Sequence, residues 1–170
     1  MFAIVKDGAI TKTGPSLKGL FPNVSFPASG PDNSWKTTEG IKEIVQGVQK
    51  DQQYYFVVEG DITLVDGVPT QAYTNTAKRL VDETIDGVLN QGLKSVMTNK
   101  VKYNAGQLLS NTDWMVIRKY ERDVAIPSAT VTYRAAVITE CARLESAIAG
   151  AGDVDALANV MAAQNWPTES

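Results

Sequence analysis

The sequence predicts an α+β protein: a small antiparallel or mixed β-sheet with one helix, followed by a C-terminal helical bundle or hairpin. Two Asp-Gly pairs, at residues 7–8 and 66–67, each join two β-prone runs, and Asp-Gly favours the positive φ angles of tight hairpin turns. After Thr74 the apolar residues recur at a spacing of about 3.6, as on one face of a helix. We therefore expect a small β-rich domain over residues 1–75 and an α-helical domain over residues 76–170.

The β-rich half is predicted to contain four or five strands. The first hairpin joins a strand over residues 2–5 to one that begins at Ala9, and the runs YYFVV, ITLV and VPTQAYT supply the other strands. A turn is expected at Glu59–Asp61, between the first two of these runs. The one helix of this half is expected over residues 38–50, because apolar side chains recur there at helical spacing. These side chains are Ile41, Ile44, Val45 and Val48.

A proline-rich segment lies between the first hairpin and this predicted helix. Residues 15–35 hold four of the seven prolines, which cannot continue a helix or donate to a sheet ladder, so we expect an ordered loop or an edge segment. The segment also contains aromatic side chains that favour burial, which argues against a free linker. These aromatic residues are candidate contacts to another protein: Phe21, Phe26 and Trp35.

Three or four antiparallel helices are predicted in the second half. Asn111 or Thr112 is placed to cap a short helix, and Pro127 ends the region after it and suits the first turn of the next helix. Asp153 is placed to cap a final helix after the glycine-containing turn at residues 150–152. The expected helices span residues 89–110, 112–123, 127–150 and 153–165.

Charge and composition exclude several classes of function. The 16 basic and 19 acidic residues give a net charge of −3 and are evenly spread, so we expect no nucleic-acid partner. No window approaches the roughly 20 apolar residues of a membrane span, and the charged start MFAIVKDG lacks the pattern of a signal peptide. We expect no membrane partner. Cys141 is the single cysteine, and in a predicted helix it is expected to pack as a small apolar residue.

The sequence contains no histidine, which removes the commonest general base and metal ligand. The acidic groups Glu59 with Asp61, and those at residues 82–86, are neighbours in predicted turns and helix starts, where acidic residues also favour the helix dipole. We therefore expect no catalytic residue, no cofactor and no metal. A glycan-degrading enzyme is an alternative if these carboxylates line a deep pocket beside Trp35 or Tyr54. A DNA-binding protein is a weaker alternative, because the basic residues of the 118–123 run alternate with acidic ones.

A pattern in the second half resembles that of small tail proteins of bacteriophages. It comprises LLSNTDW and RKYE within residues 108–121, Ile126-Pro127, YRAAV at residues 133–137, and Trp166-Pro167 near the chain end. The resemblance is to tail-fibre assembly proteins and to tail-fibre or baseplate-associated proteins. In that pattern the turn before Ile-Pro usually contains a glycine, whereas this chain has ERDVA at that place.

The resemblance implies a non-enzymatic component of the virion tail, assembled in the host cytoplasm, that binds tail-fibre or baseplate proteins as a structural adaptor or fibre module. A tail-fibre assembly chaperone is the alternative, and homo-oligomerisation is left open. The residues of this region considered as protein contacts are Trp114, Arg118, Tyr133 and Trp166. The residues alone predict that Trp114 packs as a core aromatic and that the stretch 108–137 is a hinge of the helical bundle.

Overall fold

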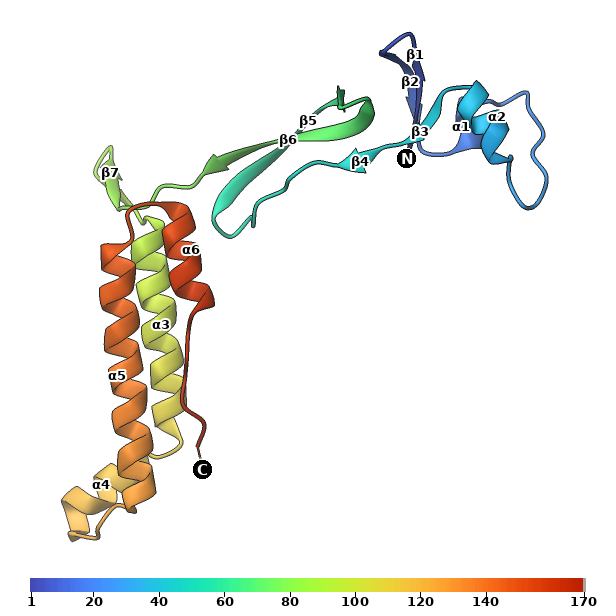
Figure 1. Ribbon diagram of the computed structural model, residues 1–170. Coiled ribbons are helices and arrows are strands. Elements are labelled where there is room, and N and C mark those ends of the chain that lie inside the picture. Colours follow the sequence, from blue (N-terminus) through green and yellow to red (C-terminus); the bar gives the residue numbers. More distant parts are fainter. Residues whose placement is uncertain (170) are drawn as a thin grey trace. The chain divides into compact units, whose positions relative to one another are not determined.

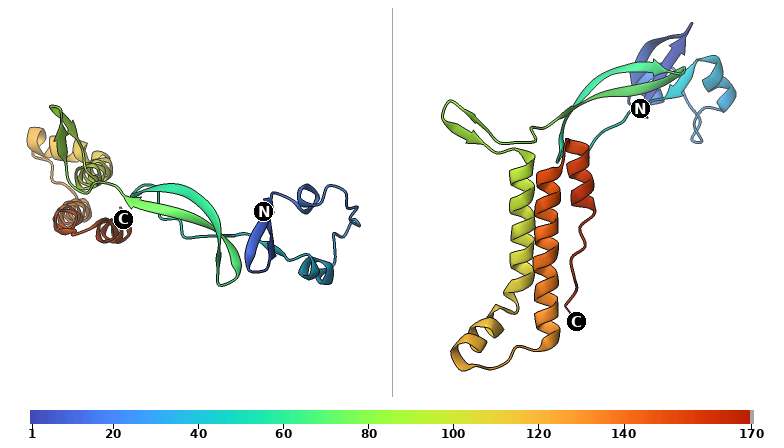
Figure 2. Two further views of the ribbon diagram at one scale, coloured as in Figure 1. Left: turned by 90° about the horizontal axis from the view of Figure 1, so that it is seen from above. Right: turned by 60° about the vertical axis from the view of Figure 1, so that its left-hand side comes forward.

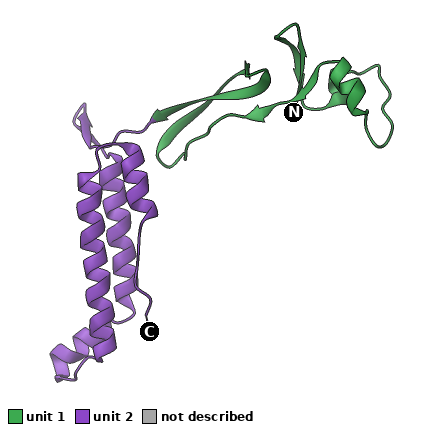
Figure 3. Cartoon of the chain, viewed as in Figure 1, with its two compact units in different colours: residues 1–76 green, residues 77–170 purple. Residues whose placement is uncertain are grey.

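The computed structural model describes residues 1–169 and has an α+β fold. The chain divides into two compact units, Met1–Thr76 and Ala77–Ser170, which we call the N-terminal and C-terminal units (Figure 3). Within the described residues, the N-terminal unit is built from two three-stranded sheets and two short helices. The C-terminal unit is built from a β-hairpin and four helices.

The first sheet of the N-terminal unit has the strand order β2–β1–β3. β1 (Phe2–Lys6) and β2 (Ala9–Gly14) form the first predicted hairpin, and β3 (Ile41–Glu43) pairs antiparallel with the other side of β1. The turn has positive φ angles at Asp7 (53°) and Gly8 (74°). This conformation confirms the turn that the Asp-Gly pair predicted.

The helix predicted over residues 38–50 is wrong. The region instead forms β3 and β4 (Val45–Gln46). Gly40 adopts a φ of 69°, and a Cβ at this position would lie 2.2 Å from the Val5 carbonyl oxygen. The Gly40 carbonyl also accepts a hydrogen bond of 2.8 Å from the Val5 amide. Gly40 therefore turns the chain onto β1, and strand pairing outweighs the helical spacing of the side chains.

The second sheet has the order β4–β6–β5 (Figure 1). β5 (Tyr55–Val65) and β6 (Val68–Ala77) form a long hairpin closed by the predicted Asp66-Gly67 turn, with φ angles of 50° and 75°, and β4 pairs parallel with β6. The turn expected at Glu59–Asp61 is wrong, because β5 continues through these residues. Pairing along β6 holds this stretch extended, and the Gln71 side chain donates to a β5 carbonyl within it.

The proline-rich segment contains two short helices that were not predicted, α1 (Leu17–Leu20) and α2 (Asn33–Thr38). α1 lies against β2 and α2 lies against β3. Each helix has a side-chain cap, because Ser16 accepts from the Gly19 amide and Asp32 accepts from the Trp35 amide. Such caps explain how helices this short form between prolines.

The chain does not become helical directly after Thr74, contrary to the prediction. β6 continues past it, and a hairpin of β7 (Glu83–Ile85) and β8 (Val88–Asn90) precedes the first long helix. The turn of this hairpin is the pair Asp86-Gly87, with φ angles of 51° and 78°. Leu89 therefore lies in a strand, because a third Asp-Gly turn reverses the chain before a helix can begin.

The C-terminal unit contains four helices, and each lies within one of the four helical segments predicted from the sequence. α3 and α5 lie antiparallel and side by side, and α6 packs against both (Figure 1, Figure 2). Asp153 caps α6 as predicted, because its side chain accepts from the Ala156 amide at 2.7 Å. The helices are α3 (Leu93–Ser110), α4 (Asp113–Arg122), α5 (Ser128–Gly150) and α6 (Val154–Ala162). Their shared core includes the fully buried side chains of Val101, Val137, Leu144, Ile148 and Leu157.

The start of α3 is tied to the segment before it. Asp82 accepts hydrogen bonds from the Gly92 amide at 2.7 Å and from Ser95 Oγ at 2.8 Å. These bonds, the backbone one first, lower the pKa of Asp82. A Cβ at Gly92 would lie 2.3 Å from the carbonyl carbon of Val81, so a glycine is needed where the two segments meet.

Candidate protein-contact site

One arginine joins the end of α3, the start of α4 and the first turns of α5. Arg134 Nη1 donates to the Leu109 carbonyl at 2.9 Å and to Thr112 Oγ1 at 2.6 Å, and Arg134 Nη2 lies 2.9 Å from Asp113 Oδ1. Its positive charge also lies at the C-terminal end of α3, where the helix dipole favours a cation. We call these four residues the Arg134 joint.

Thr112 has a different role from the predicted one. It lies at the N-cap position of α4, but its side chain makes no capping bond there. Instead its hydroxyl donates to the Leu109 carbonyl at 3.0 Å and accepts from Arg134. Thr112 is 1% exposed, so this hydroxyl is a buried polar group whose hydrogen bonds are satisfied inside the joint. The prediction that the stretch 108–137 divides into a short helix, a break at Ile126-Pro127 and a further helix is confirmed. Arg134, from the further helix, holds the junction of α3 and α4.

Two of the candidate contact residues pack within their own unit. Tyr133 is buried and its hydroxyl donates to the Leu108 carbonyl at 3.3 Å. Trp166 is half-buried, packs against the cluster that contains Tyr133, and donates from Nε1 to Gln164 Oε1 at 2.9 Å. The remaining members of the cluster are Ala105, Leu108, Leu109, Val137 and Cys141. This cluster therefore brings together side chains that are far apart in the sequence, including those of Leu108, Leu109, Tyr133 and Trp166.

α4 turns its apolar face to the solvent. None of its 10 residues is buried, and only Met115 and Arg118 are half-buried. The exposed fractions of its apolar side chains are 51% for Trp114, 41% for Val116, 56% for Ile117 and 92% for Tyr120. The prediction that Trp114 packs in the core is wrong, because the helix is fixed by the Arg134 joint with this side outward. We call Trp114, Val116, Ile117 and Tyr120 the α4 face.

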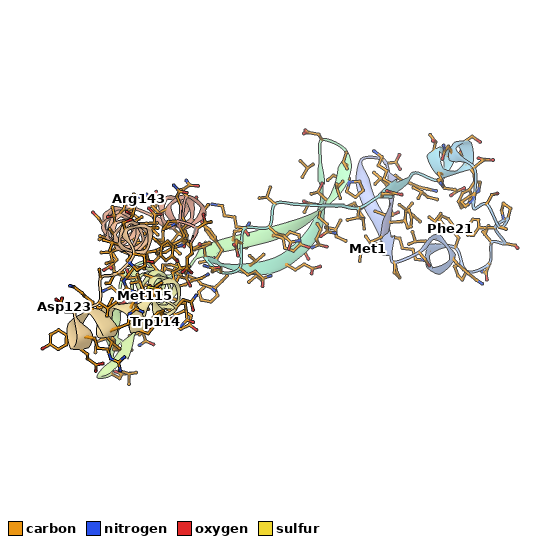
Figure 4. The ribbon with its side chains drawn as sticks, turned by 90° about the horizontal axis from the view of Figure 1, so that it is seen from below. Met1, Phe21, Trp114, Met115, Asp123 and Arg143 are labelled. Atoms are coloured by element: carbon orange, nitrogen blue, oxygen red, sulfur yellow. The ribbon has the colours of Figure 1, made fainter. Side chains whose placement is uncertain are left out.

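Arg118 holds the ring of Trp114 in place on the surface. The Arg118 guanidinium carbon lies 4.7 Å from the centre of the Trp114 ring, which is a cation–π arrangement. Arg118 Nε is buried and has no hydrogen-bond partner within residues 1–169. Figure 4 shows Trp114, Met115 and Asp123 in the region of α4. Both Trp114 and Arg118 were candidate contact residues, and they lie together at the edge of the α4 face.

Asp123 ends α4 in the left-handed conformation that glycine adopts most readily. Asp123 adopts a φ of 52°, and its amide donates to the Lys119 carbonyl at 3.0 Å. Aspartate tolerates the left-handed conformation better than most residues with a Cβ. An ion pair with the Lys119 side chain adds to this turn. The departure from glycine therefore leaves the helix end intact.

The aromatic residues of the proline-rich segment contact one another. The Trp35 ring centre lies 5.1 Å from that of Phe21 and 5.3 Å from that of Phe26, both in edge-on geometry, which is favourable for aromatic pairs. Asp32 begins α2 beneath Trp35, and its bonds to the Trp35 amide and to Ser34 lower its pKa. All three rings are half-buried, so they order the segment and still present part of their surface.

The acidic residues considered for catalysis do not act as one group. Glu59 and Asp61 are exposed on β5, Asp82 caps the start of α3, and Glu83 forms an ion pair with Arg79 at 2.6 Å. Among residues 1–169, no group of three or more His, Cys, Asp or Glu side chains is placed to hold a metal ion. In the same part of the chain, no helix is both long and apolar enough to cross a membrane.

Comparisons of this chain with protein-family models, with curated proteins and with solved structures found no match. Sequence reasoning identified Trp114 of the α4 face and Arg118 beside it, but missed Val116, Ile117 and Tyr120. Their apolar helical spacing was visible in the sequence, but the same spacing is typical of a helix that packs inward. The function of the chain is therefore inferred from its own surfaces.

Proposed function

We propose that the chain is a non-enzymatic structural component of a bacteriophage tail, which binds tail-fibre or baseplate proteins as an adaptor or fibre module. The proposal draws on the resemblance of the segments at residues 108–137 and 166–167 to phage tail proteins. The observation that carries it is the α4 face, an apolar and aromatic surface on a helix of which no residue is buried. Exposed apolar patches of this kind are typical of protein interfaces.

The Arg134 joint keeps this surface ordered before a partner binds. The joint fixes where α4 begins, and the Arg134 side chain is only 18% exposed, so its bonds are shielded from water. A contact surface that is ordered before binding loses less conformational entropy when the partner arrives. Trp114, already held by Arg118, suits the role of an interface anchor, because tryptophan, tyrosine and arginine contribute most to binding energy at interfaces.

The permanent virion component and the assembly chaperone make different predictions about particles. A structural adaptor is recovered from purified particles at a fixed copy number, whereas a chaperone that leaves is found only in the infected lysate. Mass spectrometry of both fractions, with copy number measured against the major capsid protein, separates the two roles. Absence of the chain from both fractions would contradict the tail proposal.

A substitution in the α4 face tests whether this surface makes the contact. We expect Trp114→Ala to reduce incorporation into particles by at least about tenfold, because loss of an interface anchor weakens binding by about 2 kcal/mol or more. The matched control is Tyr103→Ala, which removes an aromatic side chain that is 66% exposed on α3. Equal incorporation of both variants would show that the α4 face is not the contact surface.

A further inference from the structure

A strap of residues 163–168 follows α6 and runs along the helices toward the end of the C-terminal unit that carries α4 (Figure 1, Figure 2). Among residues 1–169, no backbone–backbone hydrogen bond holds residues 164–168. The strap is therefore held in place through side chains. A segment held in this way opens locally at a smaller cost in free energy than the core helices do.

A buried carboxylate on α5 is the first point of attachment. Glu140 is 8% exposed, and its Oε1 accepts a hydrogen bond of 2.8 Å from the Asn165 amide. Arg143 Nε and Nη2 each donate to this carboxylate at 2.7 Å, and Nη2 also donates to the Ala163 carbonyl at 3.0 Å. Apolar side chains of similar volume often stabilise a core as well as a buried ion pair does. What this pair adds over apolar residues is a fixed position for the strap.

Trp166 is the second point of attachment. Its ring is half-buried and packs against the cluster that contains Tyr133. Further along the strap, Pro167 and Thr168 line a cavity together with Tyr133 and other residues of the first turns of α5. The end of the strap therefore lies beside Tyr133.

Tyr133 connects the strap with the Arg134 joint. Its hydroxyl donates to the Leu108 carbonyl at 3.3 Å, and the next residue, Arg134, donates to the next carbonyl, that of Leu109, at 2.9 Å. The last turn of α3 is thus held to α5 by two neighbouring bonds, one of which lies beside the strap. Departure of the strap would let water compete for the tyrosine hydroxyl, because hydrogen bonds are stronger where water is excluded. Since the Arg134 joint fixes the start of α4, the position of the strap affects the order of the α4 face.

We propose that the strap is a latch for the α4 face. When the strap is seated, it supports the bonds that hold the end of α3 and keeps α4 ordered, and when it is released, both loosen. The role of α4 in binding rests on the proposed function, but the coupling between the strap and α4 is a property of the C-terminal unit alone. Because such coupling is reciprocal, a partner that orders α4 also seats the strap.

Hydrogen–deuterium exchange of the purified full-length chain, without any partner, tests the latch. Trp166→Ala removes the aromatic anchor of the strap. We expect the amides of α4 and of the last turn of α3 to exchange about two- to tenfold faster, because the loss of one neutral hydrogen bond changes an opening equilibrium by roughly this factor. The matched control is Leu93→Ala, which removes a buried side chain at the other end of α3 and should leave exchange in α4 unchanged. Unchanged exchange of α4 in Trp166→Ala would overturn the proposal, and so would equal acceleration by Leu93→Ala.

A second variant releases the strap at its other point of attachment. Glu140→Leu keeps an apolar side chain in the core but removes the acceptor for the Asn165 amide. We expect faster exchange in residues 163–168 and in α4, while the central amides of α3 and α5 keep their protection. A released strap beside an unchanged α4 would show that the two are independent, contrary to the proposal.

A double-mutant cycle measures the coupling itself. Trp166→Ala and Arg134→Met should together cost less free energy of unfolding than the sum of their single costs, because each loosens the same end of α3. Trp166→Ala and Leu93→Ala should be additive, and additivity in both cycles would count against the latch. None of these measurements needs a partner. Failure of the Trp114→Ala incorporation experiment therefore contradicts the proposed function alone, whereas unchanged exchange in α4 contradicts the latch alone.

Discussion

Replacement of Arg134 by methionine tests the Arg134 joint. Methionine keeps an unbranched apolar stem, so the change removes the guanidinium and its bonds but keeps most of the packing. Three interactions are lost: those with the Leu109 carbonyl, with Thr112 Oγ1 and with the Asp113 carboxylate. The stability of the C-terminal unit and the order of α4 both depend on them.

The structure sets the size of the loss. Hydrogen bonds to charged groups contribute about 1.5–3 kcal/mol each, and exposed ion pairs about 0–1 kcal/mol. The Leu109 carbonyl keeps two other donors, the Thr112 amide at 3.1 Å and the Thr112 hydroxyl at 3.0 Å, so it is not left unsatisfied. Asp113 has a side chain that is 56% exposed and regains water. The summed range is about 3–7 kcal/mol. Because both partners keep or regain other bonds, we expect Arg134→Met to lower the free energy of unfolding by about 2–3 kcal/mol, at or just below the low end of that range.

Urea unfolding followed by far-ultraviolet circular dichroism measures this loss, because the long helices dominate the signal. With a slope of about 2 kcal/mol per molar urea, the midpoint should fall by about 1–1.5 M. Hydrogen exchange should also become faster in α4 than in α3. The control is Arg122→Met, an exposed residue of α4, which should change stability by less than about 0.5 kcal/mol. Equal midpoints for the two variants would refute the role given to Arg134.

Three further predictions concern other parts of the C-terminal unit. The hydrogen bonds from Arg143 are the largest cause that lowers the pKa of Glu140. The stability that Glu140 contributes is therefore complete above the ordinary carboxyl pKa of about 4.5 and is lost as pH falls through the lowered value. The urea midpoints of the unaltered chain and of Glu140→Gln should accordingly converge as the pH falls below about 4.5, and a constant difference would contradict this. Gly106→Ala, where a Cβ meets nothing within 4 Å inside α3, should stabilise the unit by about 0.5–1 kcal/mol. Gly92→Ala, where a Cβ lies 2.3 Å from a backbone carbon, should destabilise it by about 1–3 kcal/mol, and the same sign for both would refute the geometry. Burial raises the pKa of the Cys141 thiol, and its bond to a neighbouring carboxylate adds to this, so alkylation at pH 8 should be much slower in the folded chain than in urea.

Local signals of turn and cap chemistry predicted much of the fold. The Asp-Gly pairs at residues 7–8 and 66–67 gave both hairpins of the N-terminal unit, and Asp153 gave the start of α6. The pair Asp86-Gly87 carries the same signal and could have been found from the sequence. It was missed because the apolar spacing around it was assigned to a helix. These elements are predictable because residues close in the sequence determine the backbone conformation.

Tertiary contacts decided the features that could not be predicted. Residues 41–46 have the spacing of a helix, but pairing with β1 and β6 makes them strands. In the sequence, the α4 face has the same apolar spacing as a helix face that packs against a core. Its outward direction follows instead from the bonds that Arg134 makes to Leu109 and Thr112, which lie more than twenty residues before it in the sequence. A side chain of this kind has no local signature. Its partners are known only when the helices have been placed.

The Arg134 joint also makes α4 a replaceable cassette. Arg134 connects the end of α3 directly to α5, so this bond bridges the segment between Asn111 and Pro127. Within that segment, α4 contributes no buried residue to the core of the helices. Changes along α4 therefore leave the packing of Val101, Val137 and Leu144 untouched. Such an arrangement allows the binding surface to diverge rapidly and to acquire new specificities at little cost in stability, as loops on a rigid scaffold do. Grafting a different helix that keeps Asp113 as its first residue, and with it the ion pair to Arg134, would be a direct way to redirect the protein to another partner.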